Sequence, residues 1–269
     1  LAKAVANSCN PAFIAIGQRL GAERFYDYLE DFGFLELTGI DMQGEAGSTV
    51  WSREWFTGPY GEASLATASF GQRFNVTPIQ LITAASAVIN GGHLMQPYVL
   101  ESITDADGNV IQSTEPTERR QVVSEATSEK CRIILEGVVN GGTGKNAYQA
   151  GFRIGGKAGS SGTLEDDHTI VSFLGFAPAD DPQVVVLIAF DNPKPTSPGG
   201  NYTSGGYYIS GGVMGATRAG ELLANILDYM GVEKQYTAEE LSGADVLTPS
   251  VTGLSLAGAQ AKAEATGLK

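Results

Sequence analysis

Two short groups of residues carry the side chains most suited to chemistry. Ser8 and Asn10 lie near the start of the chain, and Lys157, Gly159 and Ser160 lie close together much later. A serine hydroxyl is a weak nucleophile at neutral pH, and a nearby basic group activates it by taking up its proton. Serine and lysine in these two segments therefore indicate acyl transfer, provided that folding brings the segments together.

The order of the two groups along the chain indicates an acyl-transfer site more strongly than either group does alone. In isolation, Ser8 and Asn10 could cap a helix or form a turn before Pro11, and Lys157 could end a surface strand. A nucleophile with its own base, in the pattern Ser-x-x-Lys, would complete an acyl-transfer site, but the 269 residues contain no such pattern. The sequence thus indicates a chemistry without the hydroxyl group that would begin it.

The composition describes a globular and acidic chain. Apolar residues make up 42% of the 269 residues, enough for one large domain with a small appendage. The net charge of −13 argues against a nucleic-acid partner, because phosphate binding needs a basic surface. The longest apolar runs, such as residues 184–190, are too short to cross a membrane.

The cysteines and histidines form no recognisable framework. Cys9 and Cys131 stand alone, so we expect small buried side chains rather than a disulfide. His93 and His168 are equally isolated, which argues against a metal site, a bound cofactor and a Ser-His-Asp triad.

Two other patterns resemble ligand-binding loops without completing them. Residues 141–145 are rich in glycine and end in a lysine, but a phosphate-binding loop would need Gly at Val139 and Ser or Thr at Asn146. Residues 165–167 are acidic but lack the alternating ligand spacing of a calcium loop. We therefore expect no nucleotide site at residues 141–145 and a solvated turn at residues 165–167.

Hydrophobic periodicity predicts a group of strands between helices. Helical spacing predicts helices over residues 11–32, 78–90, 124–139, 213–230 and 255–265. Alternating or short apolar runs predict strands over residues 98–103, 109–112, 152–157, 169–177 and 183–191. Glycine-rich and polar composition predicts loops over 39–59 and 197–212. Together these elements predict an α+β fold in which helices flank an antiparallel sheet.

Several segments, taken in order, resemble the C-terminal part of the transpeptidase domain of class B penicillin-binding proteins, which are peptidoglycan D,D-transpeptidases. The resembling segments lie within residues 1–235, at 7–13, 68–72, 76–80, 90–92, 142–157 and 172–178. The resemblance implies the fold shared by penicillin-binding transpeptidases and serine β-lactamases, truncated at its N-terminus. Residues 236–246 are expected to form a linker, and residues 247–269 resemble the start of a PASTA domain, a wall-associated module.

The resemblance implies a role for each candidate residue. Ser8 would relay a proton toward the leaving group, and the Asn10 amide would orient the acyl-donor peptide. Lys157 would direct a positive charge at the terminal carboxylate of a D-Ala-D-Ala peptide. Ser160 would hydrogen-bond that carboxylate, and its backbone N–H would supply half of the oxyanion hole. Gly159 would lie on the strand edge along which an extended substrate pairs.

The resemblance also implies where the nucleophile belongs. We expect Ser-x-x-Lys about 50–60 positions before Ser8, upstream of Leu1. The helix that carries it would pack centrally, so the chain without it would expose an apolar face and form no covalent adduct with penicillin. The chain departs from the family at Ala158, where the motif Lys-Thr-Gly or Lys-Ser-Gly carries a hydroxyl group.

The leading hypothesis is peptidoglycan cross-linking by serine acyl transfer, with covalent penicillin binding, in an intact parent protein. The alternative is a non-catalytic wall-binding or β-lactam-sensing protein that uses the same fold. Expected partners are peptidoglycan stem peptides, β-lactams and a glycan-polymerising complex of cell division or elongation. The expected location is the extracytoplasmic face of the bacterial cytoplasmic membrane, with an anchor outside this chain.

Overall fold

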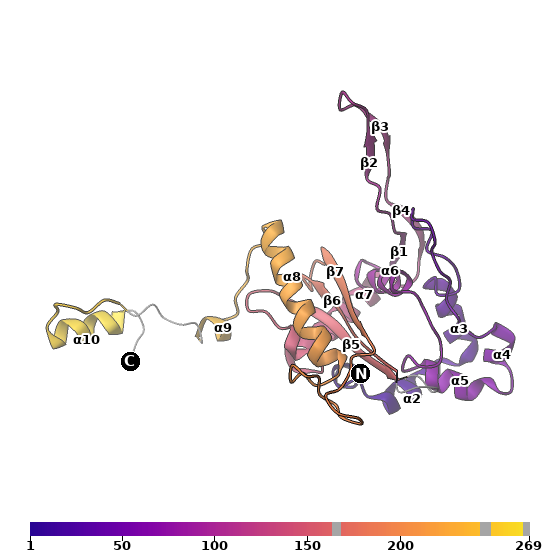
Figure 1. Cartoon of the computed structure of the whole chain (residues 1–269), viewed down its shortest axis with the longest axis horizontal. Coiled ribbons are helices and arrows are strands. Elements are labelled where there is room, and N and C mark those ends of the chain that lie inside the picture. Colours follow the sequence, from indigo (N-terminus) through magenta and orange to yellow (C-terminus); the bar gives the residue numbers. More distant parts are fainter. Residues whose placement is uncertain (163–167, 243–248, 266–269) are drawn as a thin grey trace.

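The computed structural model describes residues 1–162, 168–242 and 249–265, and the acidic turn expected at 165–167 lies outside them. An antiparallel sheet of three strands, in the order β5-β6-β7, lies between groups of helices (Figure 1). Its strands are β5 (Gly155–Gly162), β6 (Thr169–Ala177) and β7 (Val184–Asp191). The predicted α+β fold with an antiparallel sheet is therefore confirmed.

The remaining elements complete the described chain. The first six helices are α1 (Ala2–Ala6), α2 (Asn10–Leu20), α3 (Ala22–Asp31), α4 (Arg53–Thr57), α5 (Gly61–Ala68) and α6 (Pro78–Ile89). They are followed by β1 (His93–Gln96), β2 (Ser102–Thr104), β3 (Val110–Ser113), β4 (Thr117–Gln121), α7 (Glu125–Gly141) and the 3₁₀ turn η1 (Lys145–Ala147). After the sheet come the π-helical turn η2 (Gly211–Gly215), α8 (Ala216–Met230), α9 (Ala238–Ser242) and α10 (Leu256–Ala265).

The single helix predicted over residues 11–32 is wrong, because the chain forms α2 and α3 there. Gly21 separates them with φ of 85° and ψ of 155°, a backbone conformation outside the helical region. Apolar spacing continues across the break, which is why the periodicity alone predicted one helix. The loop predicted over 39–59 is also only partly right, since Ser52 caps the short helix α4.

Two predicted helix starts are confirmed in detail. Thr77 and Gln80 form a reciprocal capping box at the start of α6, with Pro78 in its first turn. Ser124 accepts a hydrogen bond from the N–H of Thr127 at the start of α7. Both caps satisfy backbone donors that a helix start otherwise leaves without partners.

The turn predicted around Asp107 joins β2 to β3 in a hairpin, which projects from the body (Figure 1). The strand predicted over 98–103 is only partly right, because β2 begins at Ser102 and residues 98–101 are not in a strand. The carboxylate of Asp105 accepts hydrogen bonds from the N–H groups of Asp107 and Asn109, both at 2.9 Å, and this closes the turn. Below the hairpin, β1 pairs with β4, a ladder that the sequence analysis did not predict.

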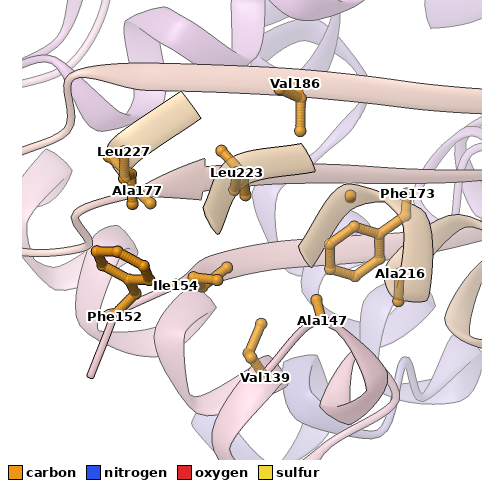
Figure 2. Packing of buried hydrophobic residues seen from close by; sticks show 11 residues of the cluster. Val139, Ala147, Phe152, Ile154, Phe173, Ala177, Val186, Ala216, Leu223 and Leu227 are labelled. Atoms are coloured by element: carbon orange, nitrogen blue, oxygen red, sulfur yellow. The ribbon is translucent and has the colours of Figure 1, made fainter. Parts of the chain in front are cut away.

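The main core lies between the sheet and α8, around the fully buried ring of Phe173 on β6 (Figure 2). Glycines surround this ring. A methyl group added to Gly144 or Gly156 would lie 2.9 Å or 2.5 Å from ring atoms of Phe173. One added to Gly215 would lie 2.8 Å from its Cβ atom. The backbone therefore approaches this side chain more closely than any larger residue would allow.

Strand β5 lies further along the chain than predicted. The sequence predicted a strand over 152–157, but β5 begins at Gly155 and its pairing with β6 continues to Gly162. Residues 158–162 are small and have low strand propensity, so only their ladder with β6 reveals the strand. As a result, Lys157, Gly159 and Ser160 all lie within the edge strand of the sheet.

Part of the expected linker is held against the body of the protein. The carboxylate of Glu240 accepts hydrogen bonds from the hydroxyl group of Tyr148 and, at 3.0 Å, from the N–H of Gly151. These bonds, with one from the N–H of Thr237, lower the pKa of Glu240 to about 2. The N–H of Gln235 also donates to the carbonyl oxygen of Gly151 at 2.8 Å. Beyond α9, α10 lies away from the body (Figure 1).

Cys9 and Cys131 are free, as expected, but both are half-buried rather than buried. Cys9 precedes α2 as its N-cap residue, and Cys131 lies within α7. None of the helices in the described parts of the chain combines the length and apolar character that a membrane span requires.

Candidate active site

The structure brings the two chemically suited segments into contact. The amine of Lys157 donates a hydrogen bond to the hydroxyl oxygen of Ser8 at 2.8 Å, although 149 positions separate the two residues. The same amine donates to the carbonyl oxygen of Ala158 at 2.7 Å. A lysine and a serine in direct contact form a pathway along which a proton can move.

The loop after α7 holds Ser8 in place. The N–H of Thr143 donates to the carbonyl oxygen of Ala6 at 2.9 Å, which ties this loop to the end of α1. A methyl group added to Gly142 would lie 2.4 Å from that oxygen, so the contact needs glycine. Ser8 itself has φ of 50°, a left-handed conformation that a non-glycine residue rarely adopts. Such local strain is found mainly where the surroundings enforce a functional geometry.

Burial shifts the protonation equilibrium of Lys157 toward its neutral form. The residue lies on β5 between the sheet and Ser8, and burial lowers the pKa of its amine below 10.5. A lysine with a lowered pKa exchanges protons more readily near neutral pH than an exposed one. The site can therefore support proton transfer as well as charge.

This pKa predicts how stability depends on pH. Between the lowered pKa and 10.5, the unfolded chain binds more protons at Lys157 than the folded chain, so stability rises with pH across this window. Lys157→Met removes the effect. We expect urea unfolding at pH 7, 8, 9 and 10 to give a free-energy difference, variant minus wild type, that declines as pH rises. Lys130→Met, on an exposed residue of α7, corrects for the loss of one positive charge. A difference that stays constant, or that grows with pH, contradicts the assignment.

Two cavities meet at this contact, and Ser8, Ala158, Gly159 and Ser160 line both of them. The small cavity has a volume of about 440 Å³ and extends toward the loop after α7 and the turn η2. The large cavity has a volume of about 630 Å³ and also contains Lys157. Its wall is mostly apolar and comes from several helices and β7, with Phe13, Phe70, Leu81, Leu135 and Leu187.

The other predicted site residues lie along these cavities. Asn10 is the first residue of α2 and lines the large cavity. Gly159 lies on β5, where an added methyl group would meet the hydroxyl oxygen of Ser172 at 2.9 Å. The hydroxyl oxygen of Ser160 accepts a hydrogen bond from the N–H of Gly211 at 3.2 Å. All five candidates therefore gather at one site, while their individual roles stay predictions.

Residues that the sequence did not predict also join distant segments here. Gln72 donates a hydrogen bond to the hydroxyl oxygen of Ser161 at 3.3 Å and links the α5–α6 connection to β5. Gly211 and Ser210, at the start of η2, lie beside Ser160. Gln72 belongs to a segment that resembled the family, so that resemblance could have marked it. The loop before η2 has no periodicity, and nothing in its pattern pointed to Ser210.

The described residues contain no cluster of His, Cys, Asp and Glu that could hold a metal ion. The two histidines pair with carboxylates instead. His93 contacts Glu118 at 2.8 Å, and His168 contacts Asp191 at the end of β7.

Comparisons with known proteins show the family of this chain. Residues 1–208 match the family model described as the penicillin binding protein transpeptidase domain. The stage V sporulation protein D of Bacillus subtilis is 40% identical over 265 residues, covering 94% of this chain and 38% of the relative. The penicillin-binding protein PbpB of Mycobacterium tuberculosis is 31% identical over 206 residues, covering 71% of this chain and 30% of the relative. The chain thus spans about a third of the length of these relatives.

Solved structures give the same result for the fold. The D,D-transpeptidase domain of a peptidoglycan glycosyltransferase from Eggerthella lenta has a TM-score of 0.71 at 28% identity, covering 86% of this chain and 54% of that one. Penicillin binding protein 3 of Mycobacterium tuberculosis, in complex with ampicillin, has a TM-score of 0.76 at 25% identity, and the match covers 88% of this chain and 52% of that chain.

Proposed function

Because the chain belongs to the penicillin binding protein transpeptidase family, we propose that it forms part of a serine D,D-transpeptidase that cross-links peptidoglycan stem peptides. The observation that carries the proposal is the hydrogen bond of 2.8 Å between Lys157 and Ser8. The bond involves β5, the edge strand of the sheet, along which an extended peptide can add as a further strand. The same site would be acylated by β-lactams.

The proposed reaction exchanges one acyl bond for another. A serine oxygen attacks the carbonyl carbon of the penultimate D-Ala, and its proton passes to the neighbouring base. The C–N bond to the terminal D-Ala then breaks, and the leaving nitrogen takes up a proton through the hydroxyl group of Ser8. Lys157 holds that hydroxyl group by donating to its oxygen, which leaves the hydrogen of Ser8 directed at the leaving group. An acceptor amine then attacks the ester carbonyl carbon, the bond from that carbon to the serine oxygen breaks, and the proton lost by the amine returns to the serine oxygen.

We further propose that the attacking serine belongs to a helix outside this chain. The large cavity offers a suitable position, because its wall is mostly apolar and it contains Lys157, Ser8 and Asn10. An amphipathic helix could bury its apolar face there and place a serine and a lysine, one turn apart, beside Ser8. The chain alone would then bind no penicillin covalently.

The proposed substrate determines the proposed location and partners. Peptidoglycan is cross-linked outside the cytoplasmic membrane, so we propose that the site acts on the extracytoplasmic face. Glycan strands must be polymerised before their peptides are joined. A glycan-polymerising complex of division, elongation or sporulation is therefore the partner we propose. Residues 247–269, which resemble the start of a PASTA domain, would follow the catalytic body.

Labelling with fluorescent penicillin tests the proposal. The full-length protein, with the sequence upstream of Leu1, should form an adduct that survives denaturation and adds the mass of one penicillin. The 269-residue chain should form none. Reversible binding without an adduct in the full-length protein would instead favour a non-catalytic β-lactam sensor. An adduct on the isolated chain would contradict the assignment of the nucleophile.

A further inference from the structure

Position 158 and the turn before α8 face the same cavity. Ala158 and Ser160 are two residues apart on β5, so their side chains point to the same side of the strand. A methyl group added to Gly212 would lie 3.9 Å from the Cβ atom of Ala158. The hydroxyl oxygen of Ser160 accepts a hydrogen bond from the N–H of Gly211. Ser210 precedes these glycines and also lines the small cavity.

The hydroxyl groups of Ser160 and Ser210 are held in the same way. The oxygen of Ser160 accepts from the N–H of Gly211, and the oxygen of Ser210 accepts from the N–H of Val213, each at 3.2 Å. A hydroxyl group has one hydrogen to donate besides its two lone pairs. Both serines are thus fixed through an acceptor lone pair and can each donate a hydrogen bond into the small cavity.

The electrostatics of the small cavity favour an anion. Lys145 is the charged side chain among its lining residues in the described parts of the chain. The turn η2 continues directly into α8, so this helical segment points its N-terminal end at Ser160. Backbone N–H groups at a helix start add positive potential. Lys157, by contrast, lines the large cavity and directs its amine at Ser8.

We infer that Ser210 provides the hydrogen-bond donor that Ala158 lacks, and that Ser160 and Ser210 together bind the terminal carboxylate of the substrate. This inference rests on the proposed transpeptidase function. Two hydroxyl groups on facing segments can each donate to one carboxylate oxygen, and hydrogen bonds to a charged acceptor are the stronger kind. Ser210 is thereby a specificity-determining residue for ligands that end in a carboxylate.

Acylation of the full-length protein by two probes tests the inference. Benzylpenicillin has a free carboxylate, and its methyl ester does not. We expect Ser210→Ala to lower the second-order acylation rate constant for benzylpenicillin by about 10- to 100-fold, as the loss of a hydrogen bond to a charged group implies. The rate constant for the methyl ester should change less than about threefold, since that probe presents no charged acceptor.

Two further variants separate binding from folding. Ala158→Ser added to Ser210→Ala should recover most of the lost rate, because it restores a hydroxyl group on the same cavity wall. Ser124→Ala removes a serine cap of the same kind from α7, at a residue that lines neither cavity, and should leave both rate constants unchanged. Equal losses with both probes would assign Ser210 a structural role only. Unchanged rates, or a failure of Ala158→Ser to restore them, would also overturn the inference.

Reversible binding of a dipeptide distinguishes failure of the proposed transpeptidase function from failure of the inference on Ser210. N-acetyl-D-Ala-D-Ala and its C-terminal amide are titrated into the full-length protein and followed by NMR. The wild type should bind the carboxylate form more tightly, and Ser210→Ala should remove that preference. If penicillin fails to acylate the protein but this preference is present and depends on Ser210, the transpeptidase proposal fails and the carboxylate site stands. If the wild type shows no preference, the inference on Ser210 fails whatever the result with penicillin.

Discussion

Lys157→Met is expected to lower the rate of penicillin acylation of the full-length protein by about 10²- to 10⁴-fold, the range found when a positioned proton-transfer group is removed. The variant loses the hydrogen bond of 2.8 Å to Ser8, and with it the group that orients the proposed proton relay. Stopped-flow or gel-based labelling at several penicillin concentrations gives the rate. The expected loss falls mainly on the chemical step rather than on the affinity of the first complex.

Lys157→Arg separates charge from proton transfer. Arginine keeps a positive charge but cannot lose its proton in a protein, and its planar group does not replace an amine at a short contact. We expect this variant to be nearly as slow as Lys157→Met. Lys130→Met, which removes an exposed charge from α7, should react like the wild type. An arginine variant that keeps more than about a tenth of the rate would assign Lys157 a purely electrostatic role.

Phe173→Ala is expected to lower the free energy of unfolding by about 3–5 kcal/mol, the usual cost of truncating a fully buried phenylalanine. The cost should lie at the upper end of this range. Glycine backbone surrounds the ring, so few side chains can move in to fill the space it leaves. Urea unfolding followed by circular dichroism measures the loss, which is a large share of the roughly 5–15 kcal/mol by which domains are commonly stable.

Tyr229→Ala provides the comparison for Phe173→Ala. Tyr229 is also aromatic, lies on α8 and is 93% exposed, so its loss should change the stability by less than about 0.5 kcal/mol. Phe173→Leu should fall between the two, since leucine fills part of the same space. Similar losses for Phe173→Ala and Tyr229→Ala would mean that the glycine-lined core does not stabilise the sheet.

Much of the fold followed from local chemistry. Apolar spacing and polar caps located α6 and α7, because a capping group and an amphipathic face are properties of a short segment. The apolar run of β6 was located to the residue for the same reason. Gly21 and the second half of β5 could not be predicted this way. A glycine at a helix break looks like a tolerated glycine, and β5 depends on its partner strand.

The candidate site was predictable to a similar degree. That Ser8 and Lys157 belong to one site followed from the order of two segments in a resembling family, whereas their direct hydrogen bond is visible only in the structure. The part played by Ser210 and Gly211 depends on how η2 packs against the sheet. The packing is close, because a methyl group added to Gly211 would lie 2.0 Å from the carbonyl oxygen of Ser172. Packing between segments this distant leaves no periodic signal in a single sequence.

The contact between Glu240 and Gly151 sets the length of a tether. If the chain left the body at Met230, where α8 ends, the ten residues to Glu240 could extend its reach by about 35 Å. Because Glu240 is bound to Tyr148 and Gly151, that additional reach is lost, and α9 is held beside the residues that follow η1. A wall-binding module joined here would sample a smaller volume, and its effective concentration near the cleft would be correspondingly higher.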